Sequence, residues 1–193
     1  MSDPTEASPQ SNRGFVIEHS TVNALVERLV DAAESLSARF DQWEEQYVSG
    51  PSLYGVVFAD PNYERYVDPL GANIWPTDVA RVVSADQEAF VQAAEEVAFS
   101  QDGAFVITVD GTIQEQMVRI RSPTATEVED RETVEYADWM GTKHLSAVEV
   151  STREEVLAAV TLSEENGRVT VFRDGTYEDR QRHELGGRWR GSR

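Results

Sequence analysis

The sequence predicts a mixed α/β domain, in which a mixed central β-sheet is flanked by helices and preceded by a long amphipathic N-terminal helix. Three observations support this fold class: a helical apolar stripe near the N-terminus, apolar runs of strand length between turn residues, and no strict alternation of strands and helices. A chain of 193 residues suits one domain with short tails. We therefore expect a disordered tail over 1–13, a single domain over 14–177 and a mobile, Arg-rich tail over 178–193.

The first half of the chain carries the signals of two helices and two strands. From Ser20 to Tyr47, apolar residues recur at spacings of three and four, which predicts one long helix ending at Ser49-Gly50-Pro51. Asp86 is a typical helix N-cap before a second apolar stripe. In chain order we expect a helix over 20–49, a strand over 53–59, a connecting loop over 60–78, a short strand over 79–83 and a helix over 86–100.

The second half has the pattern of two hairpins with helices between them. Asp110-Gly111 and Asn166-Gly167 are tight-turn dipeptides that separate apolar runs. In chain order we expect strands over 104–109 and 112–120, a loop over 121–132, a short helix over 134–140, a helix over 143–150 and strands over 156–162 and 168–172. The phosphate-binding motifs G-x-G-x-x-G and G-x-x-x-x-G-K-[ST] do not occur in the sequence.

The chain is strongly acidic, with 35 Asp and Glu residues against 17 Lys and Arg and a net charge of −18. Such a surface repels phosphate backbones and anionic lipids, so we expect no membrane contact and no nucleic-acid partner. Lys143 is the only lysine. An acid-rich, lysine-poor composition is typical of proteins in the cytosol of a salt-accumulating microbe, where salt screens the charge. An ordinary acidic protein of a mesophile is the alternative.

Three features bear on the cellular location. The sequence has no cysteine, which excludes a disulfide scaffold, a thiolate metal site and a cysteine nucleophile. It also has no apolar run of about 20 residues, and its first residues lack the basic and apolar regions of a signal peptide. We therefore expect a cytoplasmic protein.

The segment Gly-Thr-Lys-His at 141–144 is a candidate anion site. Thr142 is the expected N-cap of a helix, whose free N–H groups would favour phosphate. Lys143 and His144 add cationic or hydrogen-bonding groups to the same turn. A capped surface helix is the alternative, but the retention of the single lysine at this place favours an anion site.

Two further segments carry groups that suit a nucleotide. In Asp-Gly-Ala at 102–104, the two small residues permit close approach of a ligand. In Ser-Glu-Glu at 163–165, the paired carboxylates could hold Mg²⁺ or Mn²⁺, which prefer oxygen ligands. Either segment alone is better explained as an ordinary turn. A triphosphate and this acidic chain would together require a divalent cation, so the three segments make sense in combination.

Taken in order, Asp-Gly-Ala, Gly-Thr-Lys-His and Ser-Glu-Glu resemble the motifs of the diadenylate cyclase (DAC) domain, the nucleotide-binding domain of the DNA-integrity scanning proteins. The resemblance covers residues 85–175, and the acidic, compact chain looks like the stand-alone archaeal version. Members of this family make cyclic di-AMP from two ATP. The resemblance therefore implies ATP as the substrate and a face-to-face homodimer, or a higher oligomer, as the active form.

The resemblance also implies a role for each motif residue. Asp102 would bind the metal and help to activate the ribose 3′-OH. Substrate would be contacted by Gly103, Ala104, Gly141, Thr142, Lys143, His144 and Ser163. Mn²⁺ or Mg²⁺ would be held by Asp102 together with Glu164 or Glu165.

The sequence departs from the family pattern at two places. The family usually has Arg-His-Arg where this chain has Lys143-His144-Leu145, and often has His where this chain has Gln101. Candidates to replace the missing second arginine are Arg119, Arg121 and Arg131. Two alternatives therefore stay open: a weak or inactive relative that binds ATP or cyclic di-AMP as a sensor, and an acidic protein that oligomerises through its long helix.

Overall fold

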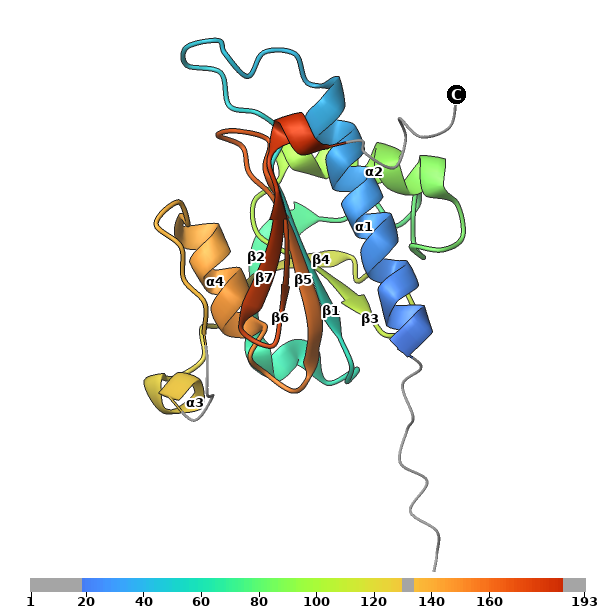
Figure 1. Cartoon of the computed structure of the whole chain (residues 1–193). Helices are drawn as coiled ribbons and strands as arrows, with labels where there is room; N and C mark the ends of the chain where they lie inside the picture. The colour runs from blue at the N-terminus through green and yellow to red at the C-terminus, as the bar shows by residue number, and fades with distance from the viewer. Residues whose placement is uncertain (1–18, 130–133, 186–193) are drawn as a thin grey trace, which may run out of the picture.

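The computed structural model of the chain describes residues 19–129 and 134–185 (Figure 1). The predicted disordered tail over 1–13 lies outside these residues. The elements, in chain order, are α1 (His19–Arg39), β1 (Leu53–Phe58), the 3₁₀ helix η1 (Tyr63–Tyr66), β2 (Val67–Ile74), α2 (Gln87–Ser100), β3 (Phe105–Thr108), β4 (Gln116–Ile120), α3 (Ala125–Glu129), α4 (Thr142–Val150), β5 (Val156–Leu162), β6 (Val169–Arg173), β7 (Thr176–Arg180) and the 3₁₀ helix η2 (Arg182–Glu184).

A five-stranded sheet with the order β3-β1-β5-β6-β7 forms the centre of the molecule. β1 is parallel to β3 and antiparallel to β5, and β5, β6 and β7 continue as an antiparallel meander. β2 and β4 form a separate two-stranded antiparallel sheet. Helices α1 and α2 cover one face of the central sheet and α4 covers the other (Figure 1). This arrangement confirms the predicted fold class.

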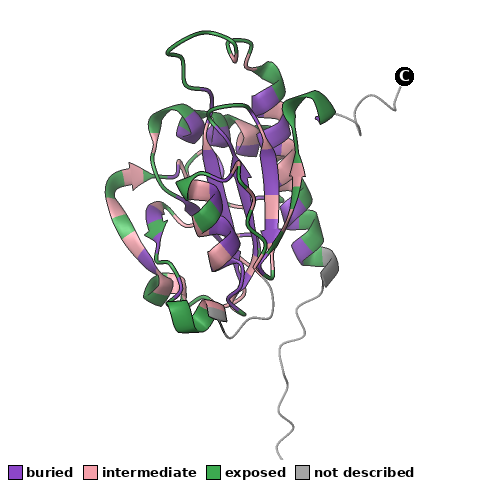
Figure 2. Ribbon diagram, turned by 60° about the vertical axis from the view of Figure 1, so that its left-hand side comes forward, coloured by how far each residue is buried: buried purple, intermediate pink, exposed green. Residues whose placement is uncertain are grey.

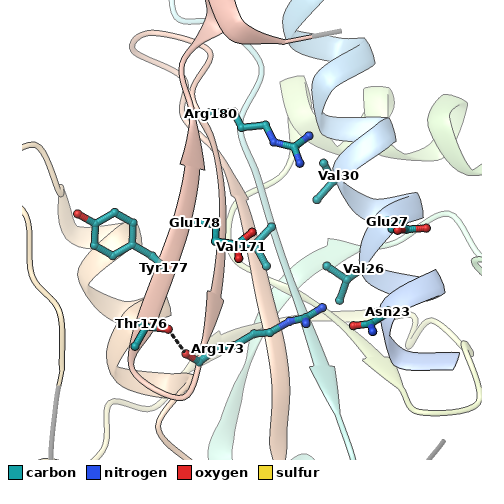
Figure 3. A pocket seen from close by; sticks show the side chains of 10 residues that line it. All are labelled: Asn23, Val26, Glu27, Val30, Val171, Arg173, Thr176, Tyr177, Glu178 and Arg180. Carbon is teal, nitrogen blue, oxygen red and sulfur yellow. Dashed lines mark hydrogen bonds between the residues drawn. The ribbon is translucent and has the colours of Figure 1, made fainter. Parts of the chain in front are cut away.

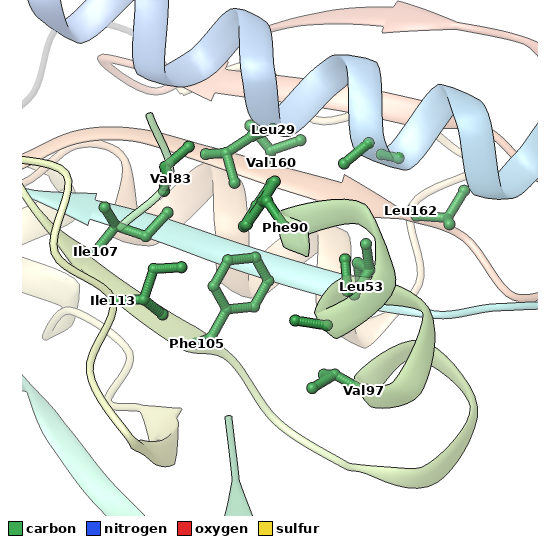
Figure 4. Packing of buried hydrophobic residues seen from close by; sticks show 14 of the residues in the cluster. Leu29, Leu53, Val83, Phe90, Val97, Phe105, Ile107, Ile113, Val160 and Leu162 are labelled. Carbon is green, nitrogen blue, oxygen red and sulfur yellow. The ribbon is translucent and has the colours of Figure 1, made fainter. Parts of the chain in front are cut away.

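β1 is buried along its whole length because helices cover both faces of the sheet (Figure 2). Leu53 packs into the core that α1 and α2 share (Figure 4). Val57 belongs to the same core, whereas Val56 and Phe58 pack into the core beneath α4. A strand that is buried on both faces needs a continuous apolar run rather than alternating polar residues. The run over 53–59 therefore predicted this strand correctly.

The first helix is shorter than the sequence predicts. Its apolar stripe is confirmed as the buried face, but α1 ends at Arg39, and the prediction of a helix is wrong for residues 40–49. Trp43 folds back, and its indole Nε1 donates a hydrogen bond to the carbonyl of Ser37 at 3.1 Å. Tyr47 has a positive φ of 67° and is 95 % exposed. Aromatic residues that pack from an irregular loop can continue a helical spacing, so the spacing alone did not mark the end of the helix.

Residues 60–78 are more regular than the predicted connecting loop. They contain η1 and β2, and β2 pairs with β4. Pro69 and Gly71 indicated a loop, yet both are accommodated because the register of this two-stranded sheet shifts between Pro69 and Ile74. The partner strand lies about forty residues later in the sequence, outside the range of any local signal.

The region around the Asp110-Gly111 turn forms only part of the predicted hairpin. The turn itself is present, with Gly111 at a φ of 85°. The returning chain meets β3 through isolated antiparallel bridges, Ala104–Val118 and Ile107–Ile113. β4 instead makes its regular ladder with β2. The predicted short strand over 79–83 is also wrong, because it reduces to one bridge between Val82 and Thr112.

The loop predicted over 121–132 contains the short helix α3. Thr124 and Glu127 form a capping box at its start: the Thr124 N–H donates to a carboxylate oxygen of Glu127 at 2.7 Å, and the Glu127 N–H donates to the Thr124 hydroxyl at 3.3 Å. This reciprocal pair stabilises a first turn. The segment is polar and has no apolar stripe, so the sequence predicted a loop instead of a helix.

Two predictions toward the C-terminus are also corrected. Residues 134–140 are irregular rather than helical, since the Glu135 N–H is satisfied by the carbonyl of Gly175 at 2.8 Å and not by a helical turn. Residues 178–185, predicted as part of a mobile tail, form the end of β7 and η2, because β7 completes its hydrogen bonds on β6. Residues 186–193 lie outside the described part of the chain.

Local signals predicted the remaining elements correctly. The side chain of Asp86 caps α2 by accepting hydrogen bonds from the N–H groups of Glu88 and Ala89 at 2.9 and 3.1 Å. β5 and β6 form the predicted hairpin across the Asn166-Gly167 turn. Among the described residues, no helix has the length and apolar character needed to cross a membrane.

Candidate functional site

The three motif segments meet at one edge of the central sheet, the edge formed by the ends of its strands and not by an outer strand. β1 and β3 both start at this edge, since they are parallel and Gly55 pairs with Phe105. β5 ends there, since it is antiparallel to β1 and Leu53 pairs with Leu162. This edge is the amino end of the parallel pair, whereas doubly wound sheets usually bind ligands at the carboxyl end. The antiparallel strand β5 is what brings the third segment to the first two.

Two adjoining cavities open at this edge. The first, of about 400 Å³, is the Asp102 cavity, and its walls include Ser52, Asp102, Gly103, Lys143 and Glu164. The second, of about 300 Å³, is the α4 cavity, and its walls include Trp139, Gly141, Thr142, Lys143, His144, Ser163, Glu164, Glu165 and Asn166. Lys143 and Glu164 line both cavities. Every motif residue that the sequence singled out, except Ala104, therefore lines one cavity or the other.

The Asp102 segment depends on the glycine that follows it. Gly103 has a φ of 93°, and a Cβ atom at this position would lie 2.2 Å from Leu70 and 2.7 Å from the carbonyl oxygen of Val118. The next residue, Ala104, is fully buried and exchanges backbone hydrogen bonds with Val118 at 2.8 and 2.9 Å. Gly103 thus permits the turn that leaves Asp102 exposed in the cavity, while Ala104 anchors the strand and does not reach the cavity wall.

Lys143 lies where the two cavities join. Its Nζ donates a hydrogen bond to the hydroxyl of Ser52, just before β1. Burial lowers the pKa of Lys143, and the negative charges of Glu164 and Asp102 oppose that shift. Its positive charge therefore faces carboxylates from two separate motif segments.

The N-terminus of α4 borders the α4 cavity. The N-cap is Gly141, not Thr142 as the sequence predicted, and no side chain caps the helix. Thr142 is the first helical residue, because Gly141 already has the extended backbone of a cap, with φ −84° and ψ −177°. The first N–H groups of a nine-residue helix are thus left without a side-chain acceptor beside Lys143 and His144.

His144 is a buried wall of the α4 cavity, with a relative exposure of 7 %. Its Nε2 atom has no hydrogen-bond partner among the described residues. Burial, helped by the positive charges of Lys143 and Arg168, lowers the pKa of His144 to about 4. The imidazole is therefore neutral near pH 7 and would offer a hydrogen bond rather than a charge.

This depressed pKa predicts a pH dependence of stability. The unfolded chain takes up a proton at the usual pKa of 6.5, whereas folded His144 stays neutral down to about pH 4. The contribution of the neutral imidazole is complete above pH 6.5 and is lost as the pH falls toward 4. We expect wild type to lose more free energy of unfolding between pH 7 and pH 5 than the His144→Gln variant, as measured by urea unfolding. Equal losses in the two proteins would contradict the buried, neutral imidazole.

The carboxylates of the site fit a metal ion that is shared with a ligand. Across the described ranges, no three His, Asp or Glu side chains form a cluster that could hold a metal on its own. Asp102 and Glu164 line the same cavity, and Glu165 lines the adjoining one. Mg²⁺ is usually bound by one or two carboxylates with substrate phosphates and water, rather than by a protein cage. Asp102 with Glu164 supplies that kind of donor set.

Trp43 holds two of the site loops together, a role that the sequence did not indicate. A Cβ atom on Gly50 would lie 2.3 Å from the Trp43 ring, and one on Gly167 would lie 2.8 Å from it. The Gly50 N–H also donates to the carbonyl of Glu164 at 2.9 Å. The loop before β1 and the turn after β5 are therefore fixed against each other at the Asp102 cavity, which Gly50 and Glu164 line. The Asn166-Gly167 turn signal was visible in the sequence, but its aromatic partner was not.

The structure does not bring Arg119 or Arg121, two of the three suggested replacement arginines, to the site. Arg119 and Arg121 pair with Asp68 of β2, at 2.9 and 2.6 Å, in the small sheet. Arg131 lies outside the described residues. Leu145, which stands where the family usually has the second arginine, is 38 % exposed.

A third cavity, of about 320 Å³, lies between α1 and strands β6 and β7 (Figure 3). Charges of both signs line it, because Arg173 and Glu178 extend from the strands and Glu27 from the helix. Arg180 at its rim pairs with Glu34 at 2.7 Å. None of the motif residues lines this groove.

Comparison with known proteins gives one family match and several solved structures of similar fold. A family model described as the DisA bacterial checkpoint controller nucleotide-binding (DAC) domain matches residues 78–177. A search of curated proteins gives no significant match. Two similar solved structures are a hypothetical membrane spanning protein from Bacillus cereus and a double mutant of DacA from Staphylococcus aureus.

Both structural matches are distant in sequence. The Bacillus cereus protein is 17 % identical with a TM-score of 0.53, and the match covers 80 % of this chain and 62 % of that one. The chain therefore spans less than two thirds of that protein. Staphylococcus aureus DacA is 17 % identical with a TM-score of 0.49, over 83 % of this chain and 88 % of that one. The first likeness extends to the fold, and the family model covers just over half of the sequence. The chain belongs to the DAC family of DisA-type nucleotide-binding domains.

Proposed function

We propose that the protein is a diadenylate cyclase, which condenses two ATP molecules into cyclic di-AMP and releases two pyrophosphates. The observation that carries the proposal is the meeting of Asp102, Lys143 and Glu164 around one cavity, beside the uncapped N-terminus of α4. A polyphosphate with its divalent cation needs this combination of carboxylates, a cation and free N–H groups. Membership of the DAC family supports a nucleotide as the ligand.

In this proposal the residues divide between holding phosphate and holding the metal. The first N–H groups of α4 and the ammonium of Lys143 bind the polyphosphate, and His144 adds a neutral hydrogen-bonding group. Asp102 and Glu164, which line the Asp102 cavity, would hold the metal, and Glu165 lines the adjoining α4 cavity. Gly103, Gly141, Thr142 and Ser163 form the walls around the nucleotide. When bound, Mn²⁺ or Mg²⁺ neutralises phosphate charge and polarises the reacting phosphoryl group.

The chemistry would be two successive phosphoryl transfers. The 3′-oxygen of one nucleotide bonds to the α-phosphorus of the other, and the bond from that phosphorus to the bridging oxygen of the β-phosphate breaks. Pyrophosphate leaves, and Asp102 would help to remove the proton of the 3′-hydroxyl. Because such transfers depend mainly on orientation and charge stabilisation, holding two nucleotides in line supplies most of the acceleration.

The same reasoning makes a second copy of the chain part of the active form. One domain offers one polyphosphate site, so two domains facing each other would place each 3′-hydroxyl against the opposite α-phosphorus. We therefore propose a face-to-face homodimer, or a larger oligomer that contains such pairs.

The experiment that tests the proposal is incubation of the purified protein with ATP and Mn²⁺, followed by chromatography and mass spectrometry. We expect one cyclic di-AMP for every two pyrophosphates. ATP binding without any product would favour the second candidate function, a sensor for ATP or cyclic di-AMP. If the protein neither binds ATP nor forms product, both functions are excluded.

The sensor reading has a specific observation in its favour. Leu145 leaves the site without the second family arginine, and neither Arg119 nor Arg121 replaces it. Weakened phosphate contacts are compatible with binding but not with fast transfer. The interaction-protein reading loses its main support, because the apolar stripe of α1 is buried against the chain's own sheet.

Variants of Lys143 test its proposed role as the phosphate-binding cation. Lys143→Met removes one charge-assisted contact, so we expect the KM for ATP to rise by about 10–100-fold. Lys143→Arg keeps the charge and should retain most of the activity. Steady-state kinetics at saturating Mn²⁺ measure both effects. An unchanged KM in the Lys143→Met variant would remove Lys143 from the substrate site.

We further propose, from composition, that the protein works in the cytoplasm of a salt-accumulating microbe. The support is the net charge of −18 and the presence of a single lysine. Since salt screens repulsion among the excess carboxylates, the free energy of unfolding should rise as KCl is raised from about 0.1 M to about 2 M. Urea unfolding at the two concentrations measures this effect. A stability that is unchanged or lower at high salt would favour an ordinary mesophile protein.

A further inference from the structure

A chain of packed side chains leads from the edge strand β7 to His144. Arg168, just before β6, forms an ion pair with Asp179 of β7. The guanidinium carbon of Arg168 lies 4.1 Å from the ring centroid of Trp139. Trp139 in turn contacts His144, with ring centroids 5.0 Å apart and planes at 81°.

Packing, rather than hydrogen bonding, holds the His144 ring. Within the residues that the structure describes, the buried Nε2 atom has no hydrogen-bond partner. The ring contacts of His144 are with Trp139 and, at 6.3 Å between centroids, with Phe172 of β6. A ring that is positioned in this way takes its orientation from its neighbours, and Trp139 is the nearer of the two.

Trp139 is itself restrained from two directions. Arg168 covers its ring, and Tyr177 of β7 meets it edge-on at 5.6 Å and 80°. The side chain of Tyr177 points away from α1 (Figure 3). The side chains of Arg168 and Asp179 are only 14 % and 25 % exposed, so this ion pair is largely shielded from water. A guanidinium that stacks and pairs at once is fixed in a way that a lysine could not reproduce.

Arg168 carries a positive charge of the kind that the site lacks because Leu145 stands in place of the second family arginine. Its placement nevertheless argues against phosphate binding. It lies outside the walls of both the Asp102 cavity and the α4 cavity, whereas Trp139 lines the α4 cavity. Its guanidinium is already engaged by Asp179 and by the Trp139 ring. Because Arg168 lies outside both walls, moving its guanidinium into either cavity would take it away from Asp179 and from the Trp139 ring.

We propose that Trp139 is a positioning residue for His144 in the polyphosphate site, and that Arg168 acts by holding Trp139 rather than by touching the nucleotide. This inference rests on the proposed function. Its physical basis is the sensitivity of phosphoryl transfer to orientation, since small displacements of a group at the reacting centre reduce rates strongly. A role through His144 has a specific consequence: the effect of changing Trp139 must disappear when His144 is absent.

A double-mutant cycle tests this consequence. We expect Trp139→Leu to lower kcat/KM by about tenfold or more, and Trp139→Phe, which keeps a ring, to restore most of the loss. In a His144→Gln background, Trp139→Leu should change kcat/KM by less than about twofold, because the two residues act as one unit. Tyr136→Leu, a change of an exposed aromatic residue in the same segment, is the matched control and should leave kcat/KM unaltered.

Two results would overturn the inference: full activity of Trp139→Leu, or the same loss in the His144→Gln background as in wild type. Urea unfolding shows whether Trp139→Leu folds. If it does not, Arg168→Met is compared in the wild-type and His144→Gln backgrounds and tests the same coupling to His144. If wild type makes no cyclic di-AMP, the proposed cyclase function fails, but the cycle can be repeated on the Kd of ATP measured by calorimetry. Additive losses of affinity would then reject the positioning role independently.

Discussion

Replacing Asp102 by asparagine is expected to reduce cyclic di-AMP synthesis by about 10²–10⁴-fold, the range for loss of a group that takes part in proton transfer. The amide would keep the shape of the side chain but lose the charge that acts on Lys143 and that would bind the proposed metal. The fold should not change, because Asp102 is exposed and its backbone, not its carboxylate, accepts a hydrogen bond from Asn73 at 3.1 Å. Product formation from ATP measures the first effect and urea unfolding the second.

The matched control for this variant is Asp41→Asn, a change of an exposed carboxylate in the loop after α1. It removes the same charge from the chain at a place outside both cavities, so its rate should equal that of wild type. Full activity of the Asp102→Asn variant would show that another group carries the role assigned to Asp102.

Replacing Trp75 by alanine is expected to lower the free energy of unfolding by about 3–5 kcal/mol, the usual cost of removing a large buried aromatic ring. Trp75 is fully buried, and its ring lies 4.5 Å from Phe105 and 5.6 Å from Phe90, measured between centroids. Its indole N–H donates to the carbonyl of Ala80 at 2.6 Å. The variant therefore leaves both a cavity and an unsatisfied carbonyl.

Urea unfolding of this variant should be read against Tyr47→Ala. Tyr47 is 95 % exposed, so its replacement should change the free energy of unfolding by no more than about 0.5 kcal/mol. A loss below about 1 kcal/mol for Trp75→Ala would contradict the close packing of α2 and β3 around this ring.

Elements with a complete local signal were predictable from the sequence. The Asp86 cap fixed the start of α2, the continuous apolar run fixed β1, and the Asn166-Gly167 turn fixed the β5–β6 hairpin. In each case the residues that determine the element lie within it or next to it. The mixed sheet with helices on both faces followed from these parts.

Elements that depend on distant partners were not predictable. β2 carries Pro69 and Gly71, which locally indicate a loop, and becomes a strand only because β4 pairs with it. The predicted helix runs past Arg39 because Trp43 continues the apolar spacing, although it packs onto Gly50 and Gly167 from a loop. Spacing reports which side of a helix is apolar, but it does not report where the chain leaves the helix.

The candidate site shows the same division. Asp102, Lys143 and Glu164 stand in short motifs that the sequence exposes. Their convergence depends on β5 lying beside β1 in the sheet, which no local pattern specifies. Ser52 and Trp139 have no motif of their own, and their contacts with Lys143 and His144 appear only when the strands and α4 are assembled.

The central claim, that Asp102, Lys143 and Glu164 surround one nucleotide polyphosphate with its metal, is tested most directly by a crystal structure with Mn²⁺ and a non-hydrolysable ATP analogue. Anomalous scattering distinguishes manganese from water and from lighter ions. We predict a manganese peak in contact with Asp102 and with phosphate oxygens, and the polyphosphate at the N-terminus of α4 beside Lys143. A nucleotide bound in the groove between α1 and β7, or manganese away from Asp102, would contradict the claim.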